Sequence, residues 1–414
     1  MGNLLSYYAQ ILFLTLIIIN HLWEIYLARR QAQFLVKNRF EIPEIFAKKI
    51  SEEEHQKSTF YANDKLKLSQ CKLIYQLALY LYWFPFRGAE SLYMNVSNFT
   101  LTGDAIFLII FVMIQSLLSL PFSYISTFYI EKKYGFNRTT HKIFFTDLIK
   151  GFVLGAIISI PLIFIILHTM SLFKNSWWII SFAIVTMIQL TMLWLFPTFI
   201  APLFNKFTPL AEGELRKRIE KLLEQVGFHA EGIFVMDASK RSSHGNAYFT
   251  GFGKNKRVVF YDTLLEKLTD DEVIAVLAHE LGHLKLKHIP KQIAISLALS
   301  FAGFLAMFLL SRFDWFYTGH FMRITTNGVL LFIFLYAVSF YTFWFSPLSS
   351  IISRKNEFEA DAFASQYASA QDLKDALTKL YKFNSSPVLS DRWYAFFYYS
   401  HPTPIQRFEK LAKS

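Results

Sequence analysis

Long apolar runs that carry almost no charge alternate with charged segments over most of the chain. A helix needs roughly 20 apolar residues to cross about 30 Å of hydrocarbon. The runs that meet or approach this length are 4–27, 68–86, 105–130, 148–170, 177–201, 291–310 and 329–347. The second run is the weakest of them, because Gln70, Lys72 and Gln76 interrupt it. This pattern predicts a mainly α, polytopic membrane protein with about seven transmembrane helices.

The segments between and after these runs space their apolar residues as water-exposed helices and strands do. Residues 214–227 have the spacing of an amphipathic helix that stops at a glycine. The stretches 232–237 and 257–265 read as short strands, and 244–253 as a strand bounded by glycines. We therefore divide the chain into spans 1–5 with their loops (1–204), a water-exposed folded segment (205–290), spans 6–7 (291–350) and a C-terminal segment (351–414).

Lysine and arginine gather in alternate loops, which predicts how the chain crosses the membrane. Basic residues follow the first, third, fifth and seventh spans, whereas the loops after the other spans hold few or none. We expect the odd-numbered loops and the C-terminus in the cytoplasm and the N-terminus outside. The first run has no basic segment before it and no small-residue cleavage site after it, so it is expected to stay as an anchor.

The composition agrees with a membrane protein. Hydrophobic residues make up 53% of the 414 residues, charged residues 18%, and the mean hydropathy is +0.31. The net charge of +11 follows from the topology and favours contact with anionic membrane lipid rather than nucleic acid. Cys71 is the single cysteine, so a metal site in this chain has to use histidine and carboxylate ligands.

One polar segment, VLAHELGHLKLKH at 276–288, contains the His-Glu-x-x-His pattern. Thr269 and Glu272 form a capping-box signal ahead of it, which predicts a helix. His279 and His283 are four residues apart and share one face of that helix, so both imidazoles can reach one metal ion. Glu280 points about 100° away, where it can accept a proton from a water that the metal activates.

A third ligand is expected from SRKNEFEADAFASQYA at 353–368, directly after the last apolar run. Glu357 could complete a His₂Glu zinc site and leave one position open. Asp361, one turn later on the same face, could accept a hydrogen bond from the far side of His279 or His283. Glu359 lies on a different face and is the competing ligand, so spacing leaves the choice between the two glutamates open.

Four further stretches accompany these two segments. They are 51–65 (SEEEHQKSTFYANDK), 130–151 (IEKKYGFNRTTHKIFFTDLIKG), 239–265 (SKRSSHGNAYFTGFGKNKRVVFYDTLL) and 399–407 (YSHPTPIQR). With HELGH, two intervening spans and NEFEADAFA, the chain resembles the type I CAAX prenyl endopeptidases over nearly its whole length. These integral-membrane zinc proteases process farnesylated a-factor and prelamin A. The resemblance implies membrane helices that enclose a large chamber, and a zincin-like α+β protease domain.

The resemblance also implies roles for single residues. His279, His283 and Glu357 would bind one zinc ion per chain, Glu280 would be the general base and Asp361 a supporting residue. His401 and Arg407 match positions near the metal that bind substrate or stabilise the oxyanion, as a hydrogen-bond donor and a carboxylate clamp could. Asn246 falls in the substrate-facing strand, whose edge could accept an extended peptide.

We therefore expect a zinc endopeptidase that cleaves prenylated CAAX-type or other membrane-associated substrates near their C-terminus. The compartment is the endoplasmic reticulum or a bacterial inner membrane, and the sequence sets no oligomeric state. One alternative is a membrane quality-control metalloprotease of the heat-shock type. Another is a transporter or scaffold with a vestigial metal site, since polar residues occur inside the spans, among them Asn20, Gln115, His168 and Gln189.

Overall fold

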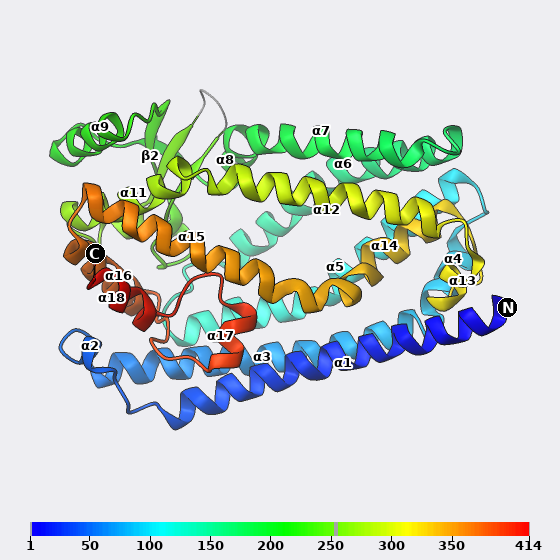
Figure 1. Cartoon of the computed structure of the whole chain (residues 1–414), viewed down its shortest axis with the longest axis horizontal. Helices are drawn as coiled ribbons and strands as arrows, with labels where there is room; N and C mark the ends of the chain where they lie inside the picture. Colours follow the sequence, from blue (N-terminus) through cyan, green and yellow to red (C-terminus); the bar gives the residue numbers. More distant parts are fainter. Residues whose placement is uncertain (1, 252–255, 414) are drawn as a thin grey trace.

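The computed structural model describes residues 2–251 and 256–413, and most of them are helical. The long helices run roughly parallel or antiparallel to one another along the long axis of the molecule (Figure 1). They are α1 (Gly2–Lys37), α3 (Glu52–Trp83), α5 (Leu101–Ile125), α6 (His141–Leu172), α7 (Trp177–Leu195), α12 (His288–Leu310), α14 (Asn327–Thr342) and α15 (Ser346–Tyr367).

Six helical segments of the described residues are long and apolar enough to cross a membrane. They are Leu4–Lys37, Leu101–Glu131, His141–Leu172, Trp177–Phe204, His288–Leu310 and Asn327–Tyr367. The expected span at 68–86 is not one of them, because it belongs to α3, whose 32 residues include many charged and amide side chains. That helix is nevertheless long enough to cross, and it packs along α1 (Figure 1).

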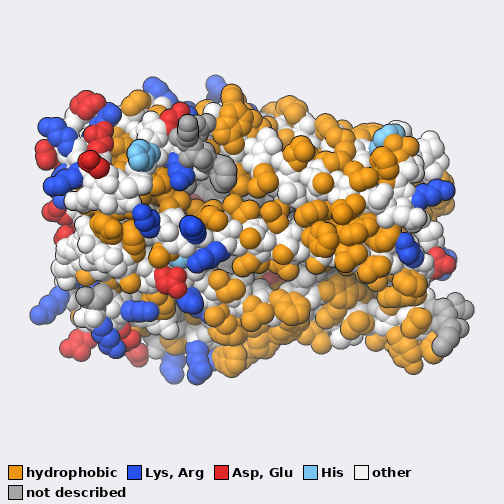
Figure 2. Space-filling view, turned by 45° about the horizontal axis from the view of Figure 1, so that its top comes forward, with side chains coloured by type: hydrophobic (Ala, Val, Ile, Leu, Met, Phe, Trp, Pro, Cys, Tyr) orange, Lys and Arg blue, Asp and Glu red, His pale blue; other side chains and the backbone are white. Residues whose placement is uncertain are grey.

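Charged side chains gather at one end of the molecule, where α9 (Glu214–Val226) lies (Figure 2). A broad surface dominated by hydrophobic side chains covers the stretch beyond it, and a few charges mark the opposite end. Among the exposed apolar side chains are Leu117, Ile157, Met187 and Leu299, one on each of four different spans. Large exposed apolar areas mark a surface that does not face water, so this band is the part that contacts lipid.

The shorter helices connect the spans and build the end of the molecule where charged side chains gather, here called the polar end. They are α2 (Glu44–Ala47), α4 (Gly88–Val96), α8 (Ala201–Phe204), α9, α10 (Asp262–Leu265), α11 (Asp270–Lys285), α13 (Asp314–Gly319), α16 (Ala370–Phe383), α17 (Arg392–Tyr398) and α18 (Pro404–Leu411). Two π-helical turns, Ser126–Glu131 and Phe196–Ile200, extend α5 and α7, and 3₁₀ turns occur at Ala238–Lys240 and Phe343–Phe345.

A four-stranded sheet lies at the polar end, in the order β1-β2-β4-β3. Its strands are β1 (Phe207–Pro209), β2 (Gly232–Met236), β3 (Ala247–Thr250) and β4 (Arg257–Tyr261). The inner pair β2–β4 is parallel, and both outer strands pair antiparallel. The three predicted strands are confirmed, although 262–265 is helical and residues 252 and 253 lie outside the described residues. The strand order leaves β3 at an edge.

A hydrophobic core joins this sheet to the helices that carry the chemistry. Apolar residues of α9, α11 and α16 pack with the inner face of β4, where Val258 and Phe260 are fully buried. The predicted helix at 214–227 ends as expected, with Gly227 in the left-handed conformation at φ 66°. A separate core between the long helices is rich in phenylalanine. The polar end is thus a packed unit that holds α11 firmly against the membrane helices.

Candidate metal centre

Helix α11 begins at the predicted capping box. The Thr269 side chain accepts the Glu272 backbone N–H at 3.4 Å, and the Glu272 carboxylate accepts the Thr269 N–H at 2.7 Å. This fixes the first turn and the phase of the helix. One helical turn separates His279 from His283, and their Nε2 atoms lie 3.3 Å apart. Two imidazole nitrogens that face each other at this distance are suited to share one ion.

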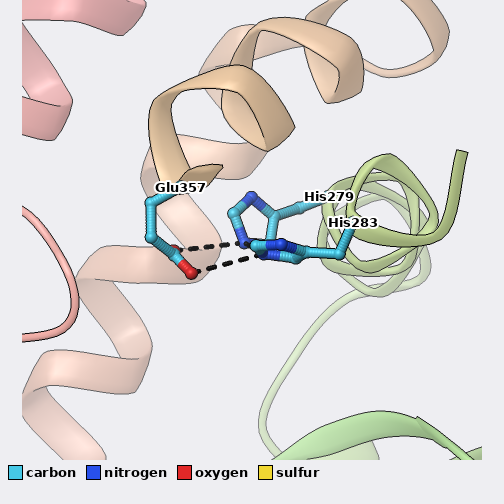
Figure 3. A group of neighbouring side chains, drawn as sticks. All are labelled: His279, His283 and Glu357. Atoms are coloured by element: carbon cyan, nitrogen blue, oxygen red, sulfur yellow. Dashed lines mark hydrogen bonds and ion pairs between the residues drawn. The ribbon is translucent and has the colours of Figure 1, made fainter. Parts of the chain in front are cut away.

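Helix α15 supplies the carboxylate that meets both rings. Glu357 Oε1 lies 3.3 Å from His283 Nε2, and Glu357 Oε2 lies 3.4 Å from His279 Nε2. Figure 3 shows the two histidines on α11 and the glutamate on α15 pointing toward one another. Among the described residues, these three form the group whose ligand atoms all lie within 4.8 Å of each other.

The carboxylate of Glu357 has the environment of a metal ligand. Its side chain is 6% exposed, and Oε2 makes no hydrogen bond to any described residue. A buried carboxylate oxygen without a donor is costly. Two histidine nitrogens and one carboxylate are also the donor set of catalytic zinc sites that keep one position open. The residues therefore fit a zinc ion.

The two helices approach unusually closely because the motif contains a glycine. A Cβ atom added to Gly282 would lie 3.0 Å from the Ala360 Cα atom and 3.2 Å from its carbonyl oxygen. Glycine in HELGH and alanine in NEFEADAFA thus let the backbones of α11 and α15 touch. This contact brings Glu357 within reach of both histidines.

Asp361 and Arg407 hold the outer side of His279. Its Nδ1 lies 2.8 Å from Asp361 Oδ1, so this nitrogen donates and leaves Nε2 free for the metal. Arg407 of α18 donates to both Asp361 oxygens, at 2.9 and 2.5 Å. Both side chains are buried, and the Asp361 and Glu357 carboxylates raise the pKa of the guanidinium against the effect of burial. Arg407 is committed mainly to Asp361, while Nη1 lies 3.8 Å from Glu357.

His283 is held on its outer side by a second histidine. Its Nδ1 lies 3.0 Å from His288 Nδ1, and His288 Nε2 lies 3.1 Å from Glu359 Oε2. Glu359, the alternative ligand in the sequence, therefore contacts His288 and not the metal group. His288, which is 1% exposed at the start of α12, was not among the predicted site residues. The sequence feature that could have identified it is its position five residues after His283, at the break between α11 and α12.

The remaining predicted residues lie at different distances from this group. His401, in the loop before α18, has its Nε2 3.4 Å from Glu357 Oε1, and 63% of its side chain is exposed. Glu280 is partly buried on α11; burial raises the pKa of its carboxyl, and His279 and His283 oppose this rise. Asn246 is exposed just before β3, and its side chain accepts only the Ala247 N–H among the described residues.

Comparisons with known proteins cover the whole site. A family model described as CAAX prenyl protease N-terminal, five membrane helices, matches residues 31–206, and the peptidase family M48 model matches residues 209–414. CAAX prenyl protease 1 of Saccharomyces cerevisiae is 35% identical, over 94% of this chain and 92% of that protein. The human CAAX prenyl protease 1 homolog is 33% identical, also over 94% and 92%.

A solved structure is similar over its full length. The crystal structure of S. mikatae Ste24p superposes with a TM-score of 0.89 at 33% identity, covering 97% of this chain and 98% of that one. The expected fold class is confirmed, with membrane helices enclosing a chamber and a small α+β protease part. The chain is a multi-pass membrane metalloendopeptidase, and neither alternative is favoured. It belongs to the CAAX prenyl protease 1 family of M48 peptidases.

Proposed function

We propose that this chain is a zinc-dependent endopeptidase that cleaves prenylated CAAX-type or other membrane-associated peptides near their C-terminus. The observation that carries the proposal is the buried Glu357 carboxylate facing the Nε2 atoms of His279 and His283. These three residues would hold one zinc ion. When bound there, zinc supplies a Lewis acid that polarises the scissile carbonyl and lowers the pKa of water.

The other residues of the site handle protons and charge. Glu280 takes a proton from the attacking water and passes it to the leaving amine nitrogen as the C–N bond breaks. Burial raises the basicity of Glu280, which suits this task. His401 lies beside Glu357 and is exposed enough to donate a hydrogen bond to the developing oxyanion. Asp361 and Arg407 keep His279 oriented, and we retain Arg407 as the candidate partner of a substrate carboxylate.

The edge strand β3 is our candidate platform for the peptide. Its outer side has no strand partner among the described residues, and it packs beside α11. An extended substrate could pair with this edge, and Asn246 stands at the start of the strand, where it could contact the peptide. The basic loops favour a cytoplasmic site, in the endoplasmic reticulum or a bacterial inner membrane.

Glu280→Gln tests this function. The variant should retain zinc, because Glu280 is not among the three ligands, and should lose cleavage of a farnesylated CAAX peptide by at least about 100-fold. Glu224→Gln, which changes an exposed glutamate on α9, is the matched control and should keep both properties. The same peptide without its prenyl group measures the prenyl requirement. Wild-type cleavage by Glu280→Gln would refute the assigned base.

A further inference from the structure

A polar cavity lies away from the metal centre, lined by residues of α6, α8 and the strands β1, β2 and β4. Its volume is about 710 Å³, and it shares no lining residue with the metal centre. Six of its lining residues are cationic and two are acidic. The cations are Lys142, Lys150, Lys206, Lys240, Arg241 and Arg257, and the acids are Asp147 and Asp237. The cavity therefore carries a strong excess of positive charge.

Both acidic residues are already engaged within the protein. The Arg241 guanidinium binds the two Asp147 oxygens at 2.8 and 3.0 Å. Asp237 accepts the backbone N–H of Lys206 at 2.7 Å. Two other cations also have partners, since Arg257 pairs with Glu231 at 2.9 Å and Lys150 donates to the Leu203 carbonyl at 2.8 Å.

Three lysine ammonium groups have neither a hydrogen-bond acceptor nor an ion-pair partner among the described residues. The ammonium groups of Lys142, Lys206 and Lys240 form no ion pair with any described residue, and all three side chains are exposed. A concave site with three unneutralised ammonium groups attracts a compact polyoxygen anion. Phosphate provides several acceptor oxygens for such groups.

Exposed apolar side chains of the membrane spans lie beside the cavity. The cavity joins the ends of two candidate spans, His141–Leu172 and Trp177–Phe204. Apolar side chains beside it are exposed, among them Ile149 at 63% and Leu203 at 53%. Positive charge at the polar end and apolar surface along the spans match the two halves of a phospholipid. A free phosphate would use only the first half.

We propose that this cavity binds the headgroup of an anionic phospholipid, with the phosphate contacted by Lys142, Lys206 and Lys240 and the acyl chains along α6 and the span Trp177–Phe204. The site is independent of the proteolytic activity. It would fix the polar end of the molecule, and with it the sheet, at the membrane surface.

The test measures lipid binding to the detergent-solubilised full-length protein by native mass spectrometry, with phosphatidylglycerol and phosphatidylcholine as probes. The cavity variant is K142Q/K206Q/K240Q, and the matched control is K217Q/K221Q/K413Q, which removes the same charge from exposed lysines elsewhere. We expect the wild type and the control to retain one phosphatidylglycerol. The cavity variant should bind it on the order of 100-fold more weakly, about fivefold per lysine.

The proposal would be overturned by equal phosphatidylglycerol binding in the cavity variant and the wild type, or by an equal loss of binding in the control. Inorganic phosphate distinguishes a free anion from a lipid. Wild-type affinity for dihexanoyl phosphatidylglycerol should exceed that for inorganic phosphate at least tenfold, and equal affinities would reject the lipid. If the triple variant unfolds on purification, the single variants K142Q and K240Q should each weaken phosphatidylglycerol binding several-fold, and unchanged binding in both would reject the site.

Discussion

Each histidine of the metal centre is held on its far side by a different partner. His279 donates to Asp361, and His283 faces His288, which in turn contacts Glu359. Metal binding through His283 Nε2 requires the ring proton on Nδ1, so His283 donates to His288 Nδ1. His288 then carries its own proton on Nε2 and donates it to Glu359. One tautomer of each ring satisfies the whole chain of contacts, which orients His283 for the metal.

Replacing His288 should therefore weaken zinc binding. His288→Phe removes the acceptor for His283 Nδ1–H, and outer partners of this kind are typically worth 10- to 100-fold in metal affinity. Glu359→Gln should cost less, because the amide oxygen can still accept from His288. Competition with a chromogenic chelator measures the affinity. His229→Phe, at an exposed loop position, is the control. Unchanged affinity in His288→Phe would show that His288 does not position the ligand.

The buried pair Asp361–Arg407 makes a different prediction, about stability. Asp361→Asn leaves the Arg407 charge without its main partner in a site that is 5% exposed, which should cost about 3 kcal/mol or more. The double variant Asp361→Asn/Arg407→Met removes both charges and should recover part of the loss. Thermal unfolding in detergent compares the two. A double variant less stable than Asp361→Asn would contradict this account.

The sequence alone could identify some of these residues and not others. HELGH places two proposed ligands and the proposed base within five residues, so helical periodicity was enough to bring them forward as candidates. Glu357 and Glu359 are separated by about 200° around the helix, and only the packing of α15 against α11 decides which one faces the histidines. The Asp361–Arg407 and His288–Glu359 contacts join residues far apart in sequence, and no local pattern encodes such pairs.

Helices α11 and α15 form the frame on which the ligands sit. Gly282→Ala would place a methyl group against the Ala360 backbone, which cannot yield as a flexible side chain could. We expect a loss of about 1–3 kcal/mol in stability and weaker zinc binding, because α15 carries Glu357 away as it shifts. Gly303→Ala in α12, which meets nothing within 4 Å, should be neutral or slightly stabilising. Chelator competition and thermal unfolding measure both, and equal behaviour of the two variants would contradict the close-contact argument.

Most helices and strands could be predicted from local sequence patterns. The elements that escaped prediction did so for local reasons. The capping box of α11 and the three longer strands lie where predicted, since periodicity and capping act over a few residues. Strand β1 escaped prediction because it has three residues and ends in Pro209, which reads as a loop. The π-helical turns that extend α5 and α7 also escaped prediction, because the spacing of their apolar residues does not differ from that of an α-helix.

The arrangement of the long helices sets how the whole molecule sits in the membrane. Apolar length predicted the lipid-facing band correctly, because composition alone decides whether a helix can face hydrocarbon. Whether α3 crosses the membrane could not be predicted from its composition. Lys65, Lys67 and Lys72 of α3 are exposed, whereas the helix as a whole packs along α1, and that packing depends on residues of another helix.

The orientation of the whole chain across the membrane is the last prediction. Lysine and arginine distribution predicts that the loop after α6 lies outside and that α9 lies in the cytoplasm. In a Cys71→Ser background, which removes the native thiol, Asn175→Cys and Lys217→Cys place one exposed cysteine at each of these positions. In right-side-out vesicles, a membrane-impermeant maleimide should label Asn175→Cys at once and Lys217→Cys only after detergent is added. The reverse order would invert the topology and move the metal centre, which shares its end of the molecule with α9, to the outer face.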